Sequence, residues 1–179
     1  MYLISIYFDE KANATISRYI HHVAKESGNL FMEENHVPPH ITISAFEAQD
    51  EGGVIQELEE LVSNWKQGKI QYVSVGAFLP YVLYITPVLN GYLHHMTQSI
   101  YETFSEKEGV KLSKYYRPFQ WLPHTTIGKK LSKEEMQKAF EVMQKQFAVF
   151  DAMVVKIGLA KTNPHRDIWT HELEKILYK

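Results

Sequence analysis

The spacing of apolar residues along the chain changes repeatedly between a strand period and a helix period. Residues 3–8 form an almost wholly apolar run, which is typical of a buried strand. In residues 15–25, apolar side chains recur every three or four positions and therefore share one helical face. Continued through the first half, the pattern predicts strand, helix, strand, helix and strand at residues 3–8, 15–25, 40–46, 54–65 and 70–79.

The second half repeats this order. Its elements are expected at residues 82–88, 93–104, 124–129, 132–147 and 149–160, with one more strand at 168–178. Ser132 and Glu135 have the spacing of a helix capping box. A polar turn at residues 162–167, which includes His165, precedes the last strand and could line the rim of a pocket.

The repeated order predicts the fold class. We expect an α+β fold with two pseudo-symmetric lobes, in which mainly antiparallel sheets with flanking helices surround a central cleft. The 179 residues are about the length of one domain. We therefore predict a single bilobal domain over residues 1–179, with residues 1–80 and 81–179 as internally duplicated halves.

One short motif occurs in each half. Pro-His-x-Thr-Ile is found at residues 39–43 and again at 123–127, so that its histidines, His40 and His124, lie 84 positions apart. Alternate side chains of a strand point to opposite faces. His40 and Thr42 should therefore share one face, and His124 and Thr126 should share the corresponding face of the second strand.

This residue set suits phosphodiester chemistry. Two imidazoles that titrate near neutral pH can serve as a general base and a general acid. Two hydroxyls can donate hydrogen bonds to anionic oxygens and stabilise charge that develops on them. We therefore predict His40, Thr42, His124 and Thr126 as catalytic residues that cleave a phosphodiester without a metal or other cofactor; the sequence does not say which histidine is the base.

The same alternation extends the candidate site beyond the motifs. Ser44 and Phe46 should continue the face of His40, and Lys130 should continue that of His124, with Lys129 pointing away unless a bulge reverses the order. Ser44, Phe46, Lys129 and Lys130 are accordingly predicted to bind substrate. For Phe46, stacking on a nucleobase and packing in the core are equally plausible interpretations.

The paired motifs resemble the 2H phosphoesterase superfamily, and within it the 2′–5′ RNA ligase and cyclic phosphodiesterase branch. Residues 82–88 resemble the strand that opens the second half in that family, and Trp121-Leu122-Pro123-His124 its lead-in to the second motif. Lys129 and Lys130 match the basic end of the family motif, whereas the first copy runs Ser44-Ala45-Phe46 without a basic residue. The resemblance implies an enzyme acting on a 2′,3′-cyclic phosphate or a 2′–5′ linkage of a nucleotide or RNA end.

Composition and charge limit the classes of substrate and binding partner that we expect. With a formal net charge of −2, the chain does not favour extended duplex nucleic acid, and a nucleotide or a terminal phosphate of RNA is the expected substrate. Cysteine is absent, which is compatible with a cytoplasmic protein, and residues 1–5 lack the charged start of a signal peptide. Residues 70–93 carry no charge, but their Pro, Gly and β-branched residues indicate two strands and a helix start, so no membrane association is expected.

Two other function classes stay open. A nucleotide-binding module without turnover would bind phosphates and leave a cyclic substrate unchanged. A histidine–metal protein is the other, but zinc needs three or four converging ligands. His36 and His40 are separated by two prolines, and the adjacent pairs His21-His22 and His94-His95 point about 100° apart on a helix, so we expect no metal site.

Overall fold

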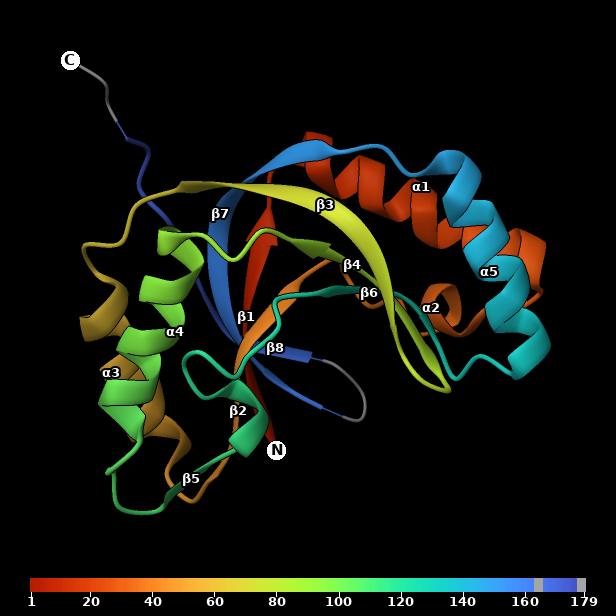
Figure 1. The fold of residues 1–179 in the computed structure, drawn as a ribbon. Helices are drawn as coiled ribbons and strands as arrows, with labels where there is room; N and C mark the ends of the chain where they lie inside the picture. The colour runs from red at the N-terminus through yellow and green to blue at the C-terminus, as the bar shows by residue number, and fades with distance from the viewer. Residues whose placement is uncertain (163–165, 177–179) are drawn as a thin grey trace.

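The computed structural model describes residues 1–162 and 166–176 and contains one branched antiparallel sheet flanked by helices (Figure 1). The strands are β1 (Tyr2–Phe8), β2 (Ile41–Ala48), β3 (Gly68–Phe78), β4 (Val82–Pro87), β5 (Val110–Leu112), β6 (Thr125–Lys129), β7 (Phe150–Lys161) and β8 (Arg166–Glu172). The helices are α1 (Glu10–Ser27), α2 (Phe31–Glu34), α3 (Glu51–Val62), α4 (Gly91–Phe104), α5 (Lys133–Gln146) and the short 3₁₀ helix η1 (Lys114–Tyr116).

The sheet runs in the order β5-β2-β1-β7-β3-β4-β6, and its branch point is the long strand β7. One edge of β7 pairs with β1 over most of its length. The opposite edge pairs first with β3, at residues 150–154, and then with β8, at residues 156–161. The sheet therefore divides, and the two strands that carry the histidine motifs, β2 and β6, lie in different branches.

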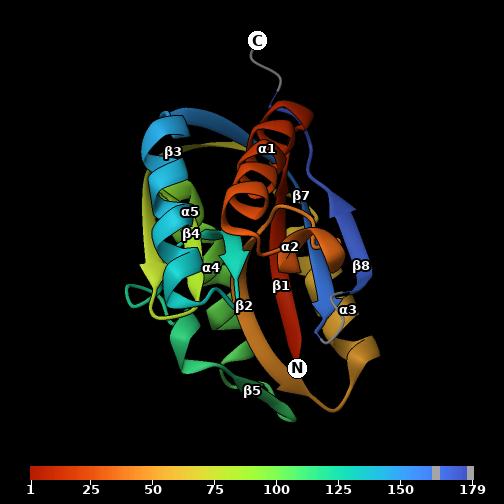
Figure 2. The same cartoon turned by 90° about the vertical axis from the view of Figure 1, so that its right-hand side faces the viewer.

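Each branch is assembled from both halves of the chain. The last strand of the first half, β3, pairs with β4 of the second half, and β7 of the second half pairs with β1 of the first. The helices follow the same exchange: α1 packs against α5 and β6, whereas α4 packs against β2 and α3. The two helix pairs lie on opposite sides of the strands (Figures 1 and 2). Origin by duplication stays a prediction.

Local sequence explains where the helices begin. Asp9, Asp50, Asn90 and Ser132 precede α1, α3, α4 and α5, and each side chain accepts a hydrogen bond from a backbone N–H of the first turn. The predicted capping box is confirmed, because the Glu135 side chain also accepts from the Ser132 N–H. Gly28 ends α1 at φ 82°, a left-handed conformation that glycine adopts without steric cost.

The predicted α+β class with antiparallel sheets is confirmed, and so is the order of the main elements. The uncharged stretch 70–93 forms β3, β4 and the start of α4. Within residues 1–162 and 166–176, no helix is long and apolar enough to cross a membrane. Part of the predicted turn, including His165, and the end of the last predicted strand, including Tyr178, lie outside the described residues.

Candidate active site

Both motif strands carry a β-bulge at the same motif position. In β2, Thr42 lies opposite Ser5 of β1 and Ser44 opposite Ile4, so that Ile43 is an extra residue. In β6, Thr126 lies opposite Tyr84 of β4 and Gly128 opposite Leu83, so that Ile127 is extra. A bulge shifts the alternation of side chains by one residue. The side chains that follow each motif threonine therefore point to the opposite face of the sheet from the one that regular alternation predicts.

The bulge overturns the expected positions of Ser44 and Phe46. Directly opposed residues of an antiparallel pair share a face. Ser44 is paired with Ile4, a core residue with no exposed surface, and Phe46 is paired with Tyr2. The prediction that Ser44 and Phe46 continue the face of His40 is therefore wrong: both lie on the core face.

Phe46 illustrates the correction. Its side chain is 1% exposed and its ring lies between those of Tyr2 and Phe104, with centroid separations of 5.7 Å to each. Of the two interpretations of Phe46, core packing is the one that the structure supports. A nucleobase has no access to this ring while α4 covers it.

The bulge also reverses the order of the two lysines. Lys129 lies opposite Val82, which is two residues from Tyr84 and shares its face. Lys130 follows the end of β6 with a left-handed backbone, φ 57°. Both amines lie near the ring of Phe31, at 5.9 Å for Lys129 and 4.7 Å for Lys130. Lys129, and not Lys130, therefore shares the face of the second motif.

The two motif histidines are held in the same way. The Nδ1 atom of His40 is 2.7 Å from the carbonyl oxygen of Pro38, and Nδ1 of His124 is 2.9 Å from that of Leu122. A carbonyl oxygen can only accept, so each Nδ1 carries the proton of its ring. The neutral ring then has its lone pair on Nε2. Both motifs thus fix the same tautomer and leave the same nitrogen, Nε2, without a proton.

Aromatic rings surround His124. Phe78 approaches it edge-on with a centroid separation of 4.8 Å, and Tyr84 lies at 5.4 Å. Burial among these rings lowers the pKa of His124 below its ordinary value, against the opposing effect of the Leu122 carbonyl. The structure therefore favours the neutral imidazole, the form that can accept a proton.

Tyr7 lies beside His40 and itself contacts two charged side chains. The ring of Tyr7 lies 6.3 Å from the imidazole, and its hydroxyl donates to the Asp167 carboxylate over 2.5 Å. The Lys156 amine lies 4.9 Å from the centre of the Tyr7 ring. These three residues, with Pro38 and others, line a hollow of about 220 Å³ next to the first motif. The two histidines therefore have chemically different surroundings.

A hydrogen bond connects the two motifs. The indole Nε1–H of Trp121, three residues before His124, donates to the Thr42 carbonyl oxygen over 3.2 Å. The Thr86 hydroxyl donates to the carbonyl of Pro123 over 2.7 Å and so fixes the same lead-in from the β4 side. Both views place β2 and β6 close together (Figures 1 and 2). Strands that end far apart in the sheet order are thereby brought next to each other.

Comparisons with known proteins identify the family. The model of the 2′-5′ RNA ligase superfamily matches residues 13–166. The chain belongs to this superfamily. It is 30% identical over 131 residues to proteins from Bacillus cereus (strain ATCC 10987 / NRS 248) and Bacillus mycoides (strain KBAB4), each named "Putative phosphoesterase". The match covers 70% of this chain but only 65% of the length of those relatives.

Solved structures share the fold of this chain over nearly its whole length. A crystal structure of a phosphoesterase superimposes with a TM-score of 0.63 at 12% identity and covers 97% of this chain and 98% of its own. Escherichia coli LigT complexed with 3′-AMP gives 0.59 at 14% identity, with 96% and 97% coverage. At these identities the likeness concerns the fold alone.

Several residues of this superfamily member lie at the motifs although sequence reasoning did not select them: Tyr7, Phe78, Tyr84, Tyr116 and Trp121. The sequence contains a partial signal for Tyr84, because this residue follows the apolar start of β4. In the structure Tyr84 pairs with Thr126 of β6. The signal for Tyr7 was absent, because its contact with Asp167 joins residues 160 positions apart.

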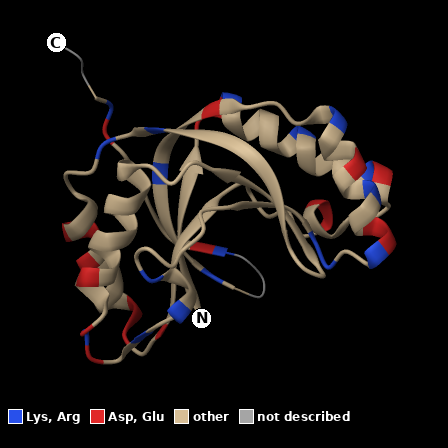
Figure 3. Cartoon of the chain, viewed as in Figure 1, with Lys and Arg blue, Asp and Glu red and all other residues tan. Residues whose placement is uncertain are grey.

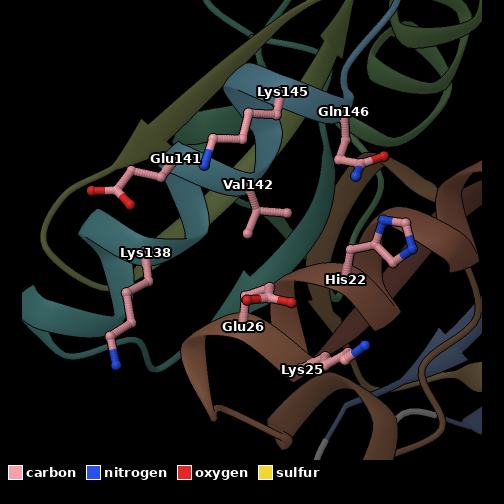
Figure 4. Close-up of a pocket in the computed structure, with 8 residues that line it drawn as sticks. All are labelled: His22, Lys25, Glu26, Lys138, Glu141, Val142, Lys145 and Gln146. Atoms are coloured by element: carbon pink, nitrogen blue, oxygen red, sulfur yellow. The ribbon is translucent and has the colours of Figure 1, made fainter.

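A larger hollow lies away from the motifs. It measures about 560 Å³ and is formed between α1 and α5 by side chains of mixed charge (Figure 4). His22, from a predicted surface pair, lines it, whereas His21 of the same pair contacts Glu33. Across residues 1–162 and 166–176, no three His, Asp or Glu side chains are grouped to hold a metal ion. That the reaction needs no metal stays a prediction.

Proposed function

We propose that the chain is a phosphoesterase that acts on a 2′,3′-cyclic phosphate or a 2′–5′ phosphodiester of a nucleotide or RNA end through His40 and His124. The observation that carries the proposal is the shared tautomer. Each Nδ1–H is bound to a carbonyl two residues earlier, so the two rings offer the same nitrogen, Nε2, for proton transfer. An acid–base pair needs one ring nitrogen of each member left available for proton transfer, and this arrangement leaves Nε2 of both rings.

The proposed hydrolysis uses the pair on opposite sides of phosphorus. One Nε2 takes a proton from water as the water oxygen attacks and forms the new P–O bond. The bond from phosphorus to one ribose oxygen breaks, and the other histidine, initially protonated, gives its proton to that oxygen. Thr42 and Thr126 donate to the non-bridging oxygens, on which charge increases in the transition state. The products are a phosphomonoester and a ribose hydroxyl.

Different surroundings make such a division of labour physically reasonable. Burial keeps His124 neutral more readily than a free imidazole, while the ring beside His40 is that of Tyr7, which contacts Asp167 and Lys156. A pair in which one ring is neutral and the other charged at the same pH needs environments that differ. Which ring acts as base depends on which ribose oxygen leaves, and the proposal assigns neither role.

The superfamily neighbours support the substrate class. E. coli LigT has been crystallised with 3′-AMP, a ribonucleotide with a phosphate on its ribose. A phosphomonoester of this kind would also be the product of the hydrolysis proposed here. The inference to this chain rests on the common fold and on the two motifs, since overall identity is only 14%.

The test is turnover of a defined panel by the purified protein in EDTA: 2′,3′-cyclic nucleotides, 2′–5′ dinucleotides and ADP-ribose cyclic phosphate. We expect at least one of these to be converted, and His40→Ala and His124→Ala each to lower the rate by about 10²–10⁴-fold. His95→Ala, on α4, is the control and should retain the rate.

Two results would contradict the proposal. If 3′-phosphorylated nucleotides bind while the whole panel stays unconverted, the chain is a binding module. If activity disappears in EDTA and returns with zinc or manganese, the chemistry depends on a metal. Unfolding of both histidine variants, seen by circular dichroism, would mean that the motifs serve the fold.

A further inference from the structure

Charge is distributed unevenly along the chain. Residues 109–133 contain six Lys or Arg and no Asp or Glu, although the whole chain has a formal charge of −2. This stretch includes the second motif. Its cations form two clusters, Lys111, Lys114 and Arg117 before the motif and Lys129, Lys130 and Lys133 after it. Acidic residues lie on the outer helices α1, α3 and α5, with basic residues among them on α1 and α5 (Figure 3).

The first cluster is fixed to the first motif strand. The Ser113 N–H donates to the carbonyl of Ala45 over 2.8 Å, and the Trp121 indole donates to that of Thr42. Between these two anchors, burial raises the pKa of Tyr116, and an interaction of its hydroxyl with the Thr42 side chain partly opposes that effect. Residues 113–121 therefore follow the edge of β2 beside its motif. We call them the edge segment.

Two aromatic side chains of the edge segment are left in solvent. Tyr115 is 71% exposed and Phe119 is 82% exposed. Phe119 also has a left-handed backbone, φ 61°, which is costly for a bulky residue and recurs where a structure holds a side chain for function. The His94 ring lies 4.2 Å from that of Phe119 and supports it from α4. An exposed ring in a strained conformation contributes little to folding.

We propose that the edge segment binds a single-stranded oligonucleotide that continues from the phosphate at the histidine site. This deepens the proposed function and rests on it, because it assigns a strand of RNA rather than a lone mononucleotide as substrate. Exposed rings next to cations are what single strands require: bases stack on the rings, and Lys and Arg neutralise the phosphates.

The available charges fit a single strand better than a duplex. Lys114 and Arg117 are exposed, and the Lys114 amine lies 5.3 Å from the centre of the Tyr115 ring. Lys111 lies opposite Glu47 of β2, which reduces its contribution. Two or three effective cations can follow a short flexible strand, whereas a duplex presents phosphates over a much wider surface. A peptide with acidic residues would use the charges but would leave the rings without stacking partners.

The experiment is fluorescence anisotropy with 3′-phosphorylated oligouridylates of one, three, five and eight nucleotides, labelled at the 5′ end, at several salt concentrations. We expect affinity to rise with length and to weaken as salt increases. Phe119→Ala should weaken binding of the eight-nucleotide strand by about 5- to 100-fold, the loss of one base stack. Arg117→Gln should lower the slope of log K against log salt by about 0.7, the value for one phosphate contact on a single strand.

Matched control variants distinguish a loss of binding caused by the edge segment from a loss caused by removing any exposed cation or aromatic ring. Arg18→Gln on α1 and Phe140→Ala on α5 remove an exposed arginine and a partly exposed phenylalanine elsewhere and should leave affinity unchanged. Phe119→Asn removes the ring with a residue that tolerates positive φ, so it reports on stacking even if Phe119→Ala unfolds.

Affinity that does not depend on length would overturn the inference, as would equal losses in the control variants. So would polyglutamate competing as well as RNA of the same charge. These failures differ from failure of the proposed function: a protein that converts cyclic mononucleotides but binds every length equally refutes only the edge segment. Length-dependent binding without any conversion refutes only the proposed reaction.

Discussion

Substituting Gly76 tests whether aromatic packing positions His124. Gly76 lies on β3 opposite Tyr84, and a Cβ added there would lie 2.6 Å from two atoms of the Tyr84 side chain, Cζ and the hydroxyl oxygen. Ordinary contact begins near 3.4 Å, so the ring would have to retreat by roughly 0.8 Å. The rings of Phe78 and His124 limit that retreat, because their centroids lie 4.5 Å and 5.4 Å from the centroid of the Tyr84 ring.

The magnitude follows from two opposing effects. Overpacking costs about 1–3 kcal/mol, and replacing a strand glycine by alanine returns about 0.5–1 kcal/mol. We therefore expect Gly76→Ala to destabilise the protein by roughly 1–2 kcal/mol, which for this chain length lowers Tm by about 2–8 °C. Displacement of His124 by a fraction of an ångström should reduce turnover by about 10–100-fold, since a shift of about 1 Å can cost 10²-fold.

The assay combines thermal unfolding with turnover of whichever cyclic substrate the protein converts. Gly91→Ala is the control, because a Cβ at this first residue of α4 meets nothing within 4 Å. It should leave turnover unchanged and should keep Tm the same or raise it slightly, because alanine lowers the conformational entropy of the unfolded chain. In Gly76→Ala/Tyr84→Leu the smaller side chain should return much of the lost stability. Full activity and an unchanged Tm in Gly76→Ala would refute the claim that the Tyr84 ring is fixed.

Three further outcomes are expected. NMR titration of His124 should give a pKa below 6.5, and Phe78→Ala should raise that pKa. As pH falls, the unfolded chain binds a proton at His124 before the folded chain does, so the free energy of unfolding should decrease below about pH 6.5 and stay constant above it. Trp121→Phe removes the donor to Thr42 and should cost about 1–3 kcal/mol in urea unfolding, with Trp65→Phe, on an outer loop, as comparison. His40→Ala/His124→Ala should be little slower than either single variant if both act in one step; multiplied losses would indicate independent roles.

The main elements could be predicted because their signals are local. The capping box at Ser132 and Glu135, the apolar period of α1 and the apolar run of β1 each depend on a few neighbouring residues. The segments α2 and β5 are four and three residues long, too short to show a period. The exchange of β3 and β7 between the branches depends on pairing between distant strands, which no local pattern records.

The faces of the motif strands could be predicted up to the motif threonines and no further. The bulges at Ile43 and Ile127 arise from registers with β1 and β4, and the sequence of β2 or β6 alone does not contain them. This is why Phe46 and Lys130 were assigned to the wrong face while His40 and His124 were selected from their repetition. The difference between the two histidine environments likewise comes from residues of other strands.

The most direct test of the account is a crystal structure of the protein with a 3′-phosphorylated nucleotide. The account predicts one phosphate bound by both Nε2 atoms, of His40 and His124, each within about 2.6–3.2 Å of a different phosphate oxygen. The Thr42 and Thr126 hydroxyls should reach the remaining oxygens. A phosphate that contacts only one of the two imidazoles, with the other directed to a separate surface, would contradict the paired-histidine site.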